Sequence, residues 1–551
     1  MEKLRKHLEI IFAALSVVFA FIAALKYFLS PGVQSEAAPG YSQKSKQLQW
    51  GSQLISEARK TSKLIFFETG AGNKSESTHE ITPFLKKSTK TGRILENCYL
   101  TAKLDGNLWP ADYAVLENLL SSNAGRKLPL KTGILSPRMR PIYLDSEIVI
   151  KDTPTHPSIA TILIAAANEY YRNKDKILES ARNSVSLIYN PQDFKSITIE
   201  SPYIPRMSFL NAESLALMAF FINPKNSEAP AAVITENARL AMRIYTTDMR
   251  QLSAKRASEL AARTMLQRLK NPEISLTEKL LIMRGISEYY FVKSDSEIIG
   301  EVSQFSDFLI ENQSPEGFIV LNGKSTVRHN ALAAGVLARA YAITGDKKYA
   351  DSARKCADRL AELQEPFGEM PAVADNSASS QSSSIEYALT VQAFCDMHYF
   401  TGDEKYINYA KRTIDEWNDF YMTPLGLWSI NSENSLLSNY ARPVFLEDNL
   451  CPSYIGTAAQ TIAYIKNHDP NFRLPNEQKI RRMAASAFTF SPFSRISNAS
   501  YKLSFFVFGN VPASRSKAPE TPTGNETESV EPEEGKQDIR ASLIKFNIPT
   551  F

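Results

Sequence analysis

The chain has 551 residues, of which 43% are hydrophobic and 22% are charged. This length is too great for one ordinary domain and fits two or three, and the composition is that of a packed globular protein. The formal net charge of +4 is small, and the Lys and Arg residues form no basic stripe with interleaved aromatics. Nucleic acid is therefore set aside as a partner.

The four cysteines are Cys98, Cys356, Cys395 and Cys451, and no two of them form a C-x-x-C pair. This spacing supports neither a clustered zinc site nor a dithiol redox pair. No Gly-rich phosphate loop or other metal-ligand spacing stands out, so we expect neither a metal nor a cofactor. Disulfides stay open as an alternative if the protein lies in an oxidising compartment.

The N-terminal region contains an apolar segment at residues 8–29 with few interruptions. Its length suits a helix that crosses the hydrocarbon core of a lipid bilayer. Lys3, Arg5 and Lys6 precede it, and the positive-inside rule then places the N-terminus in the cytoplasm. Residues 1–30 are accordingly predicted to be a cytoplasmic stub and a transmembrane anchor. A cleaved signal peptide is the alternative, although such a peptide usually has a shorter apolar core.

Helix and strand signals alternate at residues 48–150, after a linker at residues 31–47. The expected elements are a helix at 52–61, a strand at 64–67, a loop at 70–77, a helix at 80–88, a strand at 98–104 and a proline-marked strand region at 128–143. This order is typical of a thioredoxin-like α/β/α unit.

Helical periodicity dominates residues 155–510, and one pattern recurs there. The segment from Tyr341 to Ala353 is echoed by the segment from Tyr399 to Ala410, each with a Thr-Gly-Asp sequence. Gly ends one helix in the left-handed region and Asp caps the next, which predicts a stack or ring of helical hairpins. Long loops at 367–384 and 422–449 would crowd one end of such a ring and build its pocket.

The C-terminal region changes composition. Residues 511–538 are rich in Pro, Ser, Thr and Glu and are predicted to be a disordered linker. Residues 539–551 are apolar again and are expected to be either a docking strand or an exposed apolar end without a defined contact.

Several segments between about residues 50 and 512 carry a resemblance to a known family. They are Trp50, Glu57-Ala58, Lys63 to Phe67, Leu128-Pro129, Ser136-Pro137, Arg140 to Tyr143, Arg328 to Leu332, Glu386 to Ala388, Arg442-Pro443, Asp448-Asn449 and Pro452-Ser453. Their order resembles the YyaL-like or spermatogenesis-associated type proteins. In that family a thioredoxin-like domain is fused to an (α/α)6 toroid similar to N-acylglucosamine epimerases and six-hairpin glycosidases. The resemblance implies a cis-proline within 128–143.

The chain departs from this family at the positions that carry chemistry. Lys74 and Ser77 stand where the family has the two thiols of its C-x-x-C. Thiol exchange needs a thiolate and a resolving thiol, so the domain is predicted to be redox-silent. The family's His-Phe-Glu-Lys segment is also absent. The chain is therefore similar to a degenerate member.

Glu386, Asp448 and His329 are the candidate catalytic residues. Glu386 begins a helix and Asp448 lies in a loop of the same predicted rim, and two carboxylates across a pocket are what glycoside cleavage requires. The alternative is that Glu386 serves the helix dipole, while Glu447 and Asp448 are solvated or cap a helix. His329 would act as a base or bind a polar ligand, or is a structural histidine.

Five further residues are candidates for ligand binding. Arg442 would hold an anionic or hydroxylated ligand through its guanidinium, or would pair with Glu447 and hold the loop. Trp428 and Tyr387 would be platforms for sugar faces at the mouth of the ring, or core residues. Asn330, beside His329, and Glu447 itself complete the set.

These features predict an α/β thioredoxin-like domain followed by an all-α (α/α)6 toroid, with one N-terminal transmembrane helix. We expect a single-pass membrane protein with an extracytoplasmic body, periplasmic in a Gram-negative cell. The body is predicted to be non-catalytic and to bind a glycan or a membrane or periplasmic protein. The alternative is a carbohydrate-active enzyme, a glycoside hydrolase or sugar epimerase, that uses rim carboxylates.

Overall fold

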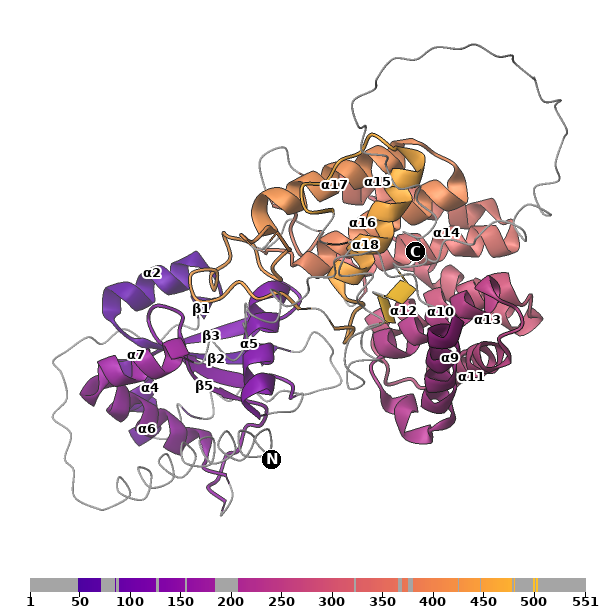
Figure 1. The fold of residues 1–551 in the computed structure, drawn as a ribbon. Helices are drawn as coiled ribbons and strands as arrows, with labels where there is room; N and C mark the ends of the chain where they lie inside the picture. The colour runs from indigo at the N-terminus through magenta and orange to yellow at the C-terminus, as the bar shows by residue number, and fades with distance from the viewer. Residues whose placement is uncertain are drawn as a thin grey trace, which may run out of the picture. The chain divides into compact units, whose positions relative to one another are not determined.

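A computed structural model gives the fold of the protein (Figure 1). It describes residues 48–70, 85, 89–124, 128–153, 156–183, 207–321, 324–364, 369–374, 380–424, 426–445, 447–477, 480, 499–500 and 502–503. The predicted anchor, the predicted loop that contains Lys74 and Ser77, and the predicted tail lie outside these residues. Within them, no helix has both the length and the apolar character that a membrane span needs.

The chain forms two compact units, and each is described by itself. The first comprises residues 1–105 and 116–188, and the second comprises residues 106–115 and 189–551. All four cysteines are described, and all four are free thiols.

The first unit is built on a five-stranded sheet. Its strands are β1 (Leu48–Gln49), β2 (Leu64–Gly70), β3 (Tyr99–Asp105), β4 (Thr132–Leu135) and β5 (Pro141–Asp145). Their order is β1-β3-β2-β4-β5, with β1, β3 and β2 parallel and with β4 antiparallel to both β2 and β5. Central strand β2 is buried from Leu64 to Phe67 because it lies between two neighbours and carries an unbroken apolar sequence.

Helices connect and cover these strands. They are α2 (Ser52–Thr61), α4 (Thr89–Cys98), α5 (Pro110–Ala124), α6 (Ile159–Arg172) and α7 (Lys174–Asn183). The predicted helix at 52–61 and both predicted strands are present, whereas α4 and α5 were not predicted. The proline-marked region forms two strands where one was expected. The implied cis-proline is a wrong prediction, because no described residue follows a cis peptide bond.

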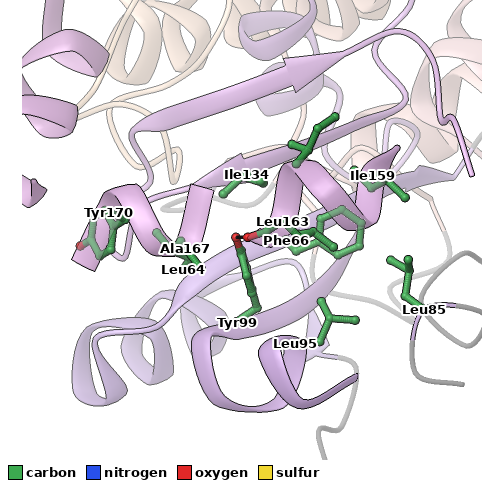
Figure 2. Close-up of a cluster of buried hydrophobic side chains, with 11 residues drawn as sticks. Leu64, Phe66, Leu85, Leu95, Tyr99, Ile134, Ile159, Leu163, Ala167 and Tyr170 are labelled. Carbon is green, nitrogen blue, oxygen red and sulfur yellow. Dashed lines mark hydrogen bonds between the residues drawn. The ribbon is translucent and has the colours of Figure 1, made fainter. Parts of the chain in front are cut away.

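Helix α6 packs on the sheet of the first unit, although the sequence placed it in the helical part. Ile159, Leu163 and Ala167 of α6 join the cluster formed by Phe66 of β2 and Tyr99 of β3 (Figure 2). The Tyr99 hydroxyl donates to the backbone carbonyl of Leu163 at 2.7 Å. Apolar burial and this hydrogen bond fix α6 to the sheet, so the helical unit begins after it.

The second unit is an α-toroid-like arrangement of helices. In chain order they are α9 (Met207–Ile222), the short 3-10 helix η2 (Pro224–Glu228), α10 (Ala231–Thr247), α11 (Leu252–Leu269), α12 (Leu276–Val292), α13 (Ser296–Glu311), α14 (Val327–Thr344), α15 (Lys347–Glu362), α16 (Ser384–Thr401), α17 (Lys405–Tyr421) and α18 (Tyr454–His468). Helices α10, α12, α14, α16 and α18 pack in succession and are buried around most of their circumference. Helices α11, α13, α15 and α17 each keep an exposed face. Arg239 of α10 and Gln460 of α18 share a hydrogen bond of 3.3 Å, which joins the first inner helix to the last.

The two turns of the sequence repeat have the predicted conformation. Gly345 ends α14 at φ 74° and Gly402 ends α16 at φ 71°, both in the left-handed region. A side-chain oxygen of Asp346 accepts from the backbone N–H of Lys348, and Asp403 accepts from Lys405 in the same way. The predicted pair of helical hairpins is confirmed at α14–α15 and α16–α17.

Candidate functional site

The N-terminal ends of neighbouring inner helices meet at one face of the ring, which we call the rim. Thr277, in the first turn of α12, shares a 3.0 Å hydrogen bond with Nε2 of His329, in the first turn of α14. Arg328 of α14 donates from Nε to Glu386, in the first turn of α16, at 2.8 Å. The loops that precede α16 and α18 lie at the same ends of these helices and complete the rim.

Glu386 is buried and stabilises the start of α16. Its Oε2 accepts from the backbone N–H of Ser383 at 2.8 Å and from the Ser383 hydroxyl, which forms a capping box. Its Oε1 accepts from Arg328. Both carboxylate oxygens are therefore engaged by protein donors, as in the structural interpretation of this residue.

His329 and Asn330 lie side by side at the start of α14. Burial, and then the nearby charge of Arg328, lowers the pKa of the His329 imidazole to about 4. A neutral ring with so low a pKa is a weak general base at pH 7. Asn330 is buried, accepts from the N–H of Ile319 at 2.7 Å and donates to the carbonyl of Thr326 at 2.8 Å. It connects α14 to the preceding loop.

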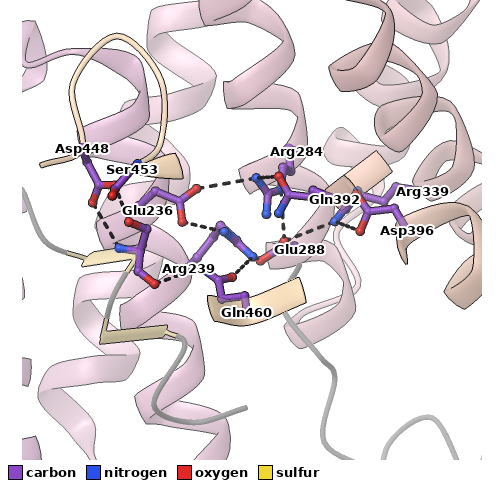
Figure 3. A network of polar contacts seen from close by, with 11 residues as sticks. Glu236, Arg239, Arg284, Glu288, Arg339, Gln392, Asp396, Asp448, Ser453 and Gln460 are labelled. Carbon is purple, nitrogen blue, oxygen red and sulfur yellow. Dashed lines mark hydrogen bonds and ion pairs between the residues drawn. The ribbon is translucent and has the colours of Figure 1, made fainter. Parts of the chain in front are cut away.

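Asp448 is fully buried in the loop before α18. It accepts from the N–H of Ser453 at 2.7 Å, the N–H of Ser500 at 3.1 Å and the Ser500 hydroxyl at 2.5 Å. Burial, and then the negative charge of Glu236, raises the pKa of its carboxyl to about 7, against the opposing effect of these donors. Figure 3 shows Asp448 beside Glu236, whereas the sequence interpretation combined it with Glu386.

Arg442 and Glu447 lie in the same loop without an ion pair between them in the described part of the chain. Arg442 donates from Nη2 to the backbone carbonyl of Phe420 at 3.0 Å, and burial lowers the pKa of its guanidinium. Glu447 is exposed. The loop is therefore held by a contact from Arg442 to backbone, and Glu447 faces solvent.

The aromatic side chains expected at the mouth are buried. Trp428 stacks on Trp417 with ring centroids 4.3 Å apart, and its Nε1 donates to Asn418 at 2.9 Å. The Tyr387 hydroxyl donates to Glu416 at 2.5 Å. Trp428, Trp417 and Tyr387 have no exposed surface, so all three are core residues.

A polar cluster in the rim loops escaped the sequence interpretation. Glu369 accepts from Gln381 at 2.8 Å, Ser432 at 2.9 Å, Asn434 at 2.7 Å and Tyr421 at 3.3 Å. We call these five residues the Glu369 cluster. Four of its members come from the loops predicted to build a pocket, and Tyr421 ends α17. Contacts between residues as far apart as Glu369 and Asn434 leave no local sequence pattern.

The Glu369 cluster adjoins Glu386 through Tyr421. The single proton of the Tyr421 hydroxyl is shared between Glu369 and the carbonyl of Ser382, which lies 2.8 Å away and one residue before the capping serine of α16. Burial raises the pKa of Tyr421, and the nearby Tyr387, Glu369 and Glu386 raise it further. Tyr421 therefore lies between the Glu369 cluster and the start of α16, near both Glu369 and Glu386.

Charged and amide side chains from the inner helices also meet in one buried network, which we call the axial network (Figure 3). They are nearly inaccessible to solvent and alternate in charge. The network comprises Glu236 and Arg239 of α10, Arg284 and Glu288 of α12, Arg339 of α14, Gln392 and Asp396 of α16 and Gln460 of α18.

Close ion pairs stabilise this axial network. Arg239 donates to Glu236 at 2.6 Å and to Glu288 at 2.8 Å. Arg339 donates to both oxygens of Asp396, at 2.6 and 2.9 Å. Burial raises the pKa of Asp396, and the charge of Arg339 opposes that shift. Since such pairs are costly to break once buried, they specify how the inner helices pack.

A metal centre has no support in the described residues. Among them, no group of three or more His, Cys, Asp or Glu side chains is arranged to hold a metal ion.

No family model and no curated protein matches the chain. Solved structures with some similarity include the unsaturated glucuronyl hydrolase of Bacillus sp. GL1, at 13% identity over 57% of this chain and 100% of that chain, with a TM-score of 0.42. An alpha-mannanase of Bacteroides thetaiotaomicron has 12% identity over 55% and 96%, with a TM-score of 0.40. A D-mannose isomerase has 12% identity over 53% and 88%, with a TM-score of 0.40. Similarities at this level establish no activity for this chain.

Proposed function

We propose that the protein is a membrane-anchored, extracytoplasmic scaffold that binds a glycan or a protein partner without turning it over. In this proposal the first unit is a redox-silent thioredoxin-like domain, and the second is an (α/α)6 toroid of the six-hairpin-glycosidase type. The chain would be a degenerate relative of the YyaL-like proteins. The strand order β1-β3-β2-β4-β5 with an antiparallel β4 supports the thioredoxin-like assignment.

One observation carries the non-catalytic assignment. The groups nominated for proton transfer are engaged in stabilising helix ends. Glu386 forms the capping box of α16 and pairs with Arg328, His329 has a pKa of about 4, and Asp448 holds the start of α18. A general acid or base must reach the reacting atom and titrate near the working pH.

The test uses Glu386→Gln, which removes the charge with little change in shape. We expect no release of reducing sugar by the wild type, and a loss of about 1.5–3 kcal/mol in the free energy of unfolding for the variant, because charged hydrogen bonds are lost. The exposed Glu447→Gln is the control and should stay within about 0.5 kcal/mol of the wild type. Saccharide turnover that Glu386→Gln abolishes in a folded protein would overturn the proposal.

A second candidate is a carbohydrate-active enzyme with Asp448 as the acid. The observation that favours it is the raised pKa of the Asp448 carboxyl, which is about 7 beside Glu236. Carboxylic acids that act as general acids near neutral pH have pKa values raised in this way. The full burial of Asp448 counts against this candidate. Turnover that depends on Asp448 and not on Glu386 would select this candidate.

A further inference from the structure

We propose that the Glu369 cluster, together with Arg442, is a contact site for the hydroxyl groups of a neutral saccharide. This inference rests on the proposed function in its glycan-binding form. It assigns the glycan to a specific site and to a specific ligand class. Gln381, Asn434 and Arg442 would contact the ligand. Glu369 would act as a positioning residue.

Several side chains of the proposed site are accessible to solvent. Asn434 is exposed, and Glu369, Gln381 and Arg442 are partly exposed. Glu386 and Asp448, in contrast, are buried. A ligand in solution can therefore reach Gln381, Asn434 and Arg442.

Gln381 and Asn434 keep hydrogen-bonding capacity after their contacts with Glu369 are made. Oε1 of Glu369 accepts from Ser432 and Asn434, and Oε2 accepts from Gln381 and Tyr421. Both oxygens are occupied, so the carboxylate orients the two amides and is not itself free to bind. No group among the described residues donates a hydrogen bond to the side-chain oxygens of Gln381 and Asn434. Both oxygens can therefore accept from a ligand.

Arg442 supplies a donor beside these acceptors. Its Nη2 binds the carbonyl of Phe420 and its Nε is buried, while its Nη1 makes no hydrogen bond within the described part of the chain. The charges of Glu433 and Glu369 lie near its guanidinium. A saccharide hydroxyl both donates and accepts, so amide oxygens next to a guanidinium N–H match a pair of neighbouring hydroxyls.

The charge of the site selects a neutral saccharide. The carboxylates of Glu433 and Glu369 lie near one guanidinium, that of Arg442. Carboxylates in excess repel a uronic acid or a sulfated sugar, whereas neutral hydroxyls are accepted. The site therefore fits a hexose polymer without acidic groups.

The experiment measures binding of the full chain in detergent to immobilised mannan, dextran and hyaluronan by surface plasmon resonance. We expect binding to at least one of the two neutral polysaccharides and none to hyaluronan. Asn434→Ala, at an exposed position, should weaken binding at least tenfold. Asn471→Ala, the same change at an exposed position after α18, should stay within twofold of the wild type.

Glu369→Gln separates positioning from stability. The Gln side chain would place an N–H group where Glu369 now accepts hydrogen bonds, so the amides of Gln381 and Asn434 would lose their fixed orientation. We therefore expect a tenfold loss of affinity for the neutral polysaccharide. Glu369→Asp keeps the charge and should restore part of the binding. Unfolding temperatures measured in parallel identify a variant that fails to fold. If the Glu369 variants do not fold, the affinity of Asn434→Ala is the test of the proposed site.

Each of the following results would contradict a specific element of the proposal. Binding to a neutral polysaccharide that Asn434→Ala and Glu369→Gln leave intact would place the glycan elsewhere and keep the proposed function. Binding to hyaluronan alone would overturn the neutral ligand class. Binding to none of the three would remove both this site and glycan binding, and would leave a protein partner.

Discussion

Asp448 shows how burial and neighbouring charge set the behaviour of a single residue. Its carboxyl accepts three hydrogen bonds, which favour the ionised form, yet burial and Glu236 raise its pKa to about 7 from an ordinary value of 3.8. The native state therefore binds a proton between about pH 4 and pH 7 that the unfolded state releases.

We predict that this group makes the protein less stable as the pH rises. Because the folded pKa lies above the unfolded one, its contribution to the free energy of unfolding is greatest below about pH 4 and is lost as the pH passes 7. The full difference is at most about 4 kcal/mol, at 1.4 kcal/mol per pKa unit. Urea denaturation at pH 5 and pH 8 measures it in the wild type and in Asp448→Asn.

The amide of Asp448→Asn cannot accept from all three donors, so the variant loses stability at both pH values. The informative quantity is the change between pH 5 and pH 8, which should shrink in this variant. Glu447→Gln removes a carboxylate from the preceding, exposed residue and should leave that change as in the wild type. An unaltered pH dependence in Asp448→Asn would contradict the assigned cause.

Single residues of the rim were only partly predictable from sequence. The pattern Ser383-x-x-Glu386 is a capping-box signature, whereas the structural alternative for Glu386 was predicted from the helix dipole alone. Nothing local indicated Glu369, because its partners in the second loop lie more than 60 residues away. The burial of Trp428 was also unpredictable, since it depends on stacking against Trp417.

At the scale of helices, the inner ring depends on close approach between α14 and α16. Gly335 of α14 faces the ion pair of Arg339 and Asp396. A Cβ at this glycine would lie 2.8 Å from a carboxylate oxygen of Asp396 and 3.3 Å from a guanidinium nitrogen of Arg339. Both partners are buried and bonded to each other, so neither can move away without loss.

We predict that Gly335→Ala destabilises the protein by about 1–3 kcal/mol, the usual cost of overpacking. Gly300→Ala in α13 is the matched control, since no atom lies within 4 Å of its added Cβ. That change should stabilise the protein by about 0.5–1 kcal/mol, because glycine is unfavourable inside a helix. Denaturant unfolding of both variants measures the difference, and equal effects would contradict the close approach.

The sequence contains a periodic pattern that corresponds to the axial network. Charged or amide side chains stand at helical spacing within mostly apolar helices, as in Arg284 and Glu288 of α12 and in Gln392 and Asp396 of α16. Such residues lie on one face of a helix. What the sequence did not reveal is that these faces meet in one buried network, because that depends on how the helices pack.

At the scale of the whole molecule, the C-terminal part of the described chain completes the ring. Ser500 accepts from the Gln460 amide through its carbonyl at 2.9 Å and donates to Asp448. Lys502 pairs with Glu213 of α9 at 2.5 Å, and the two side chains are only 1% and 9% exposed. These contacts connect residues near the end of the chain to the first and last helices of the second unit.

We predict that a chain ending at residue 497 has a destabilised second unit, whereas a chain ending at residue 510 does not. The shorter chain leaves Glu213 buried without Lys502, and breaking such a buried pair costs about 3–5 kcal/mol. It also removes the Ser500 donors from Asp448. Denaturation followed by circular dichroism compares both chains with the full one, and proteolysis at Arg and Lys should appear first in the ring of the shorter chain. If the two truncated chains unfold at the same denaturant concentration, residues 499–503 do not close the ring, and its stability comes from the packing of α10 to α18 alone.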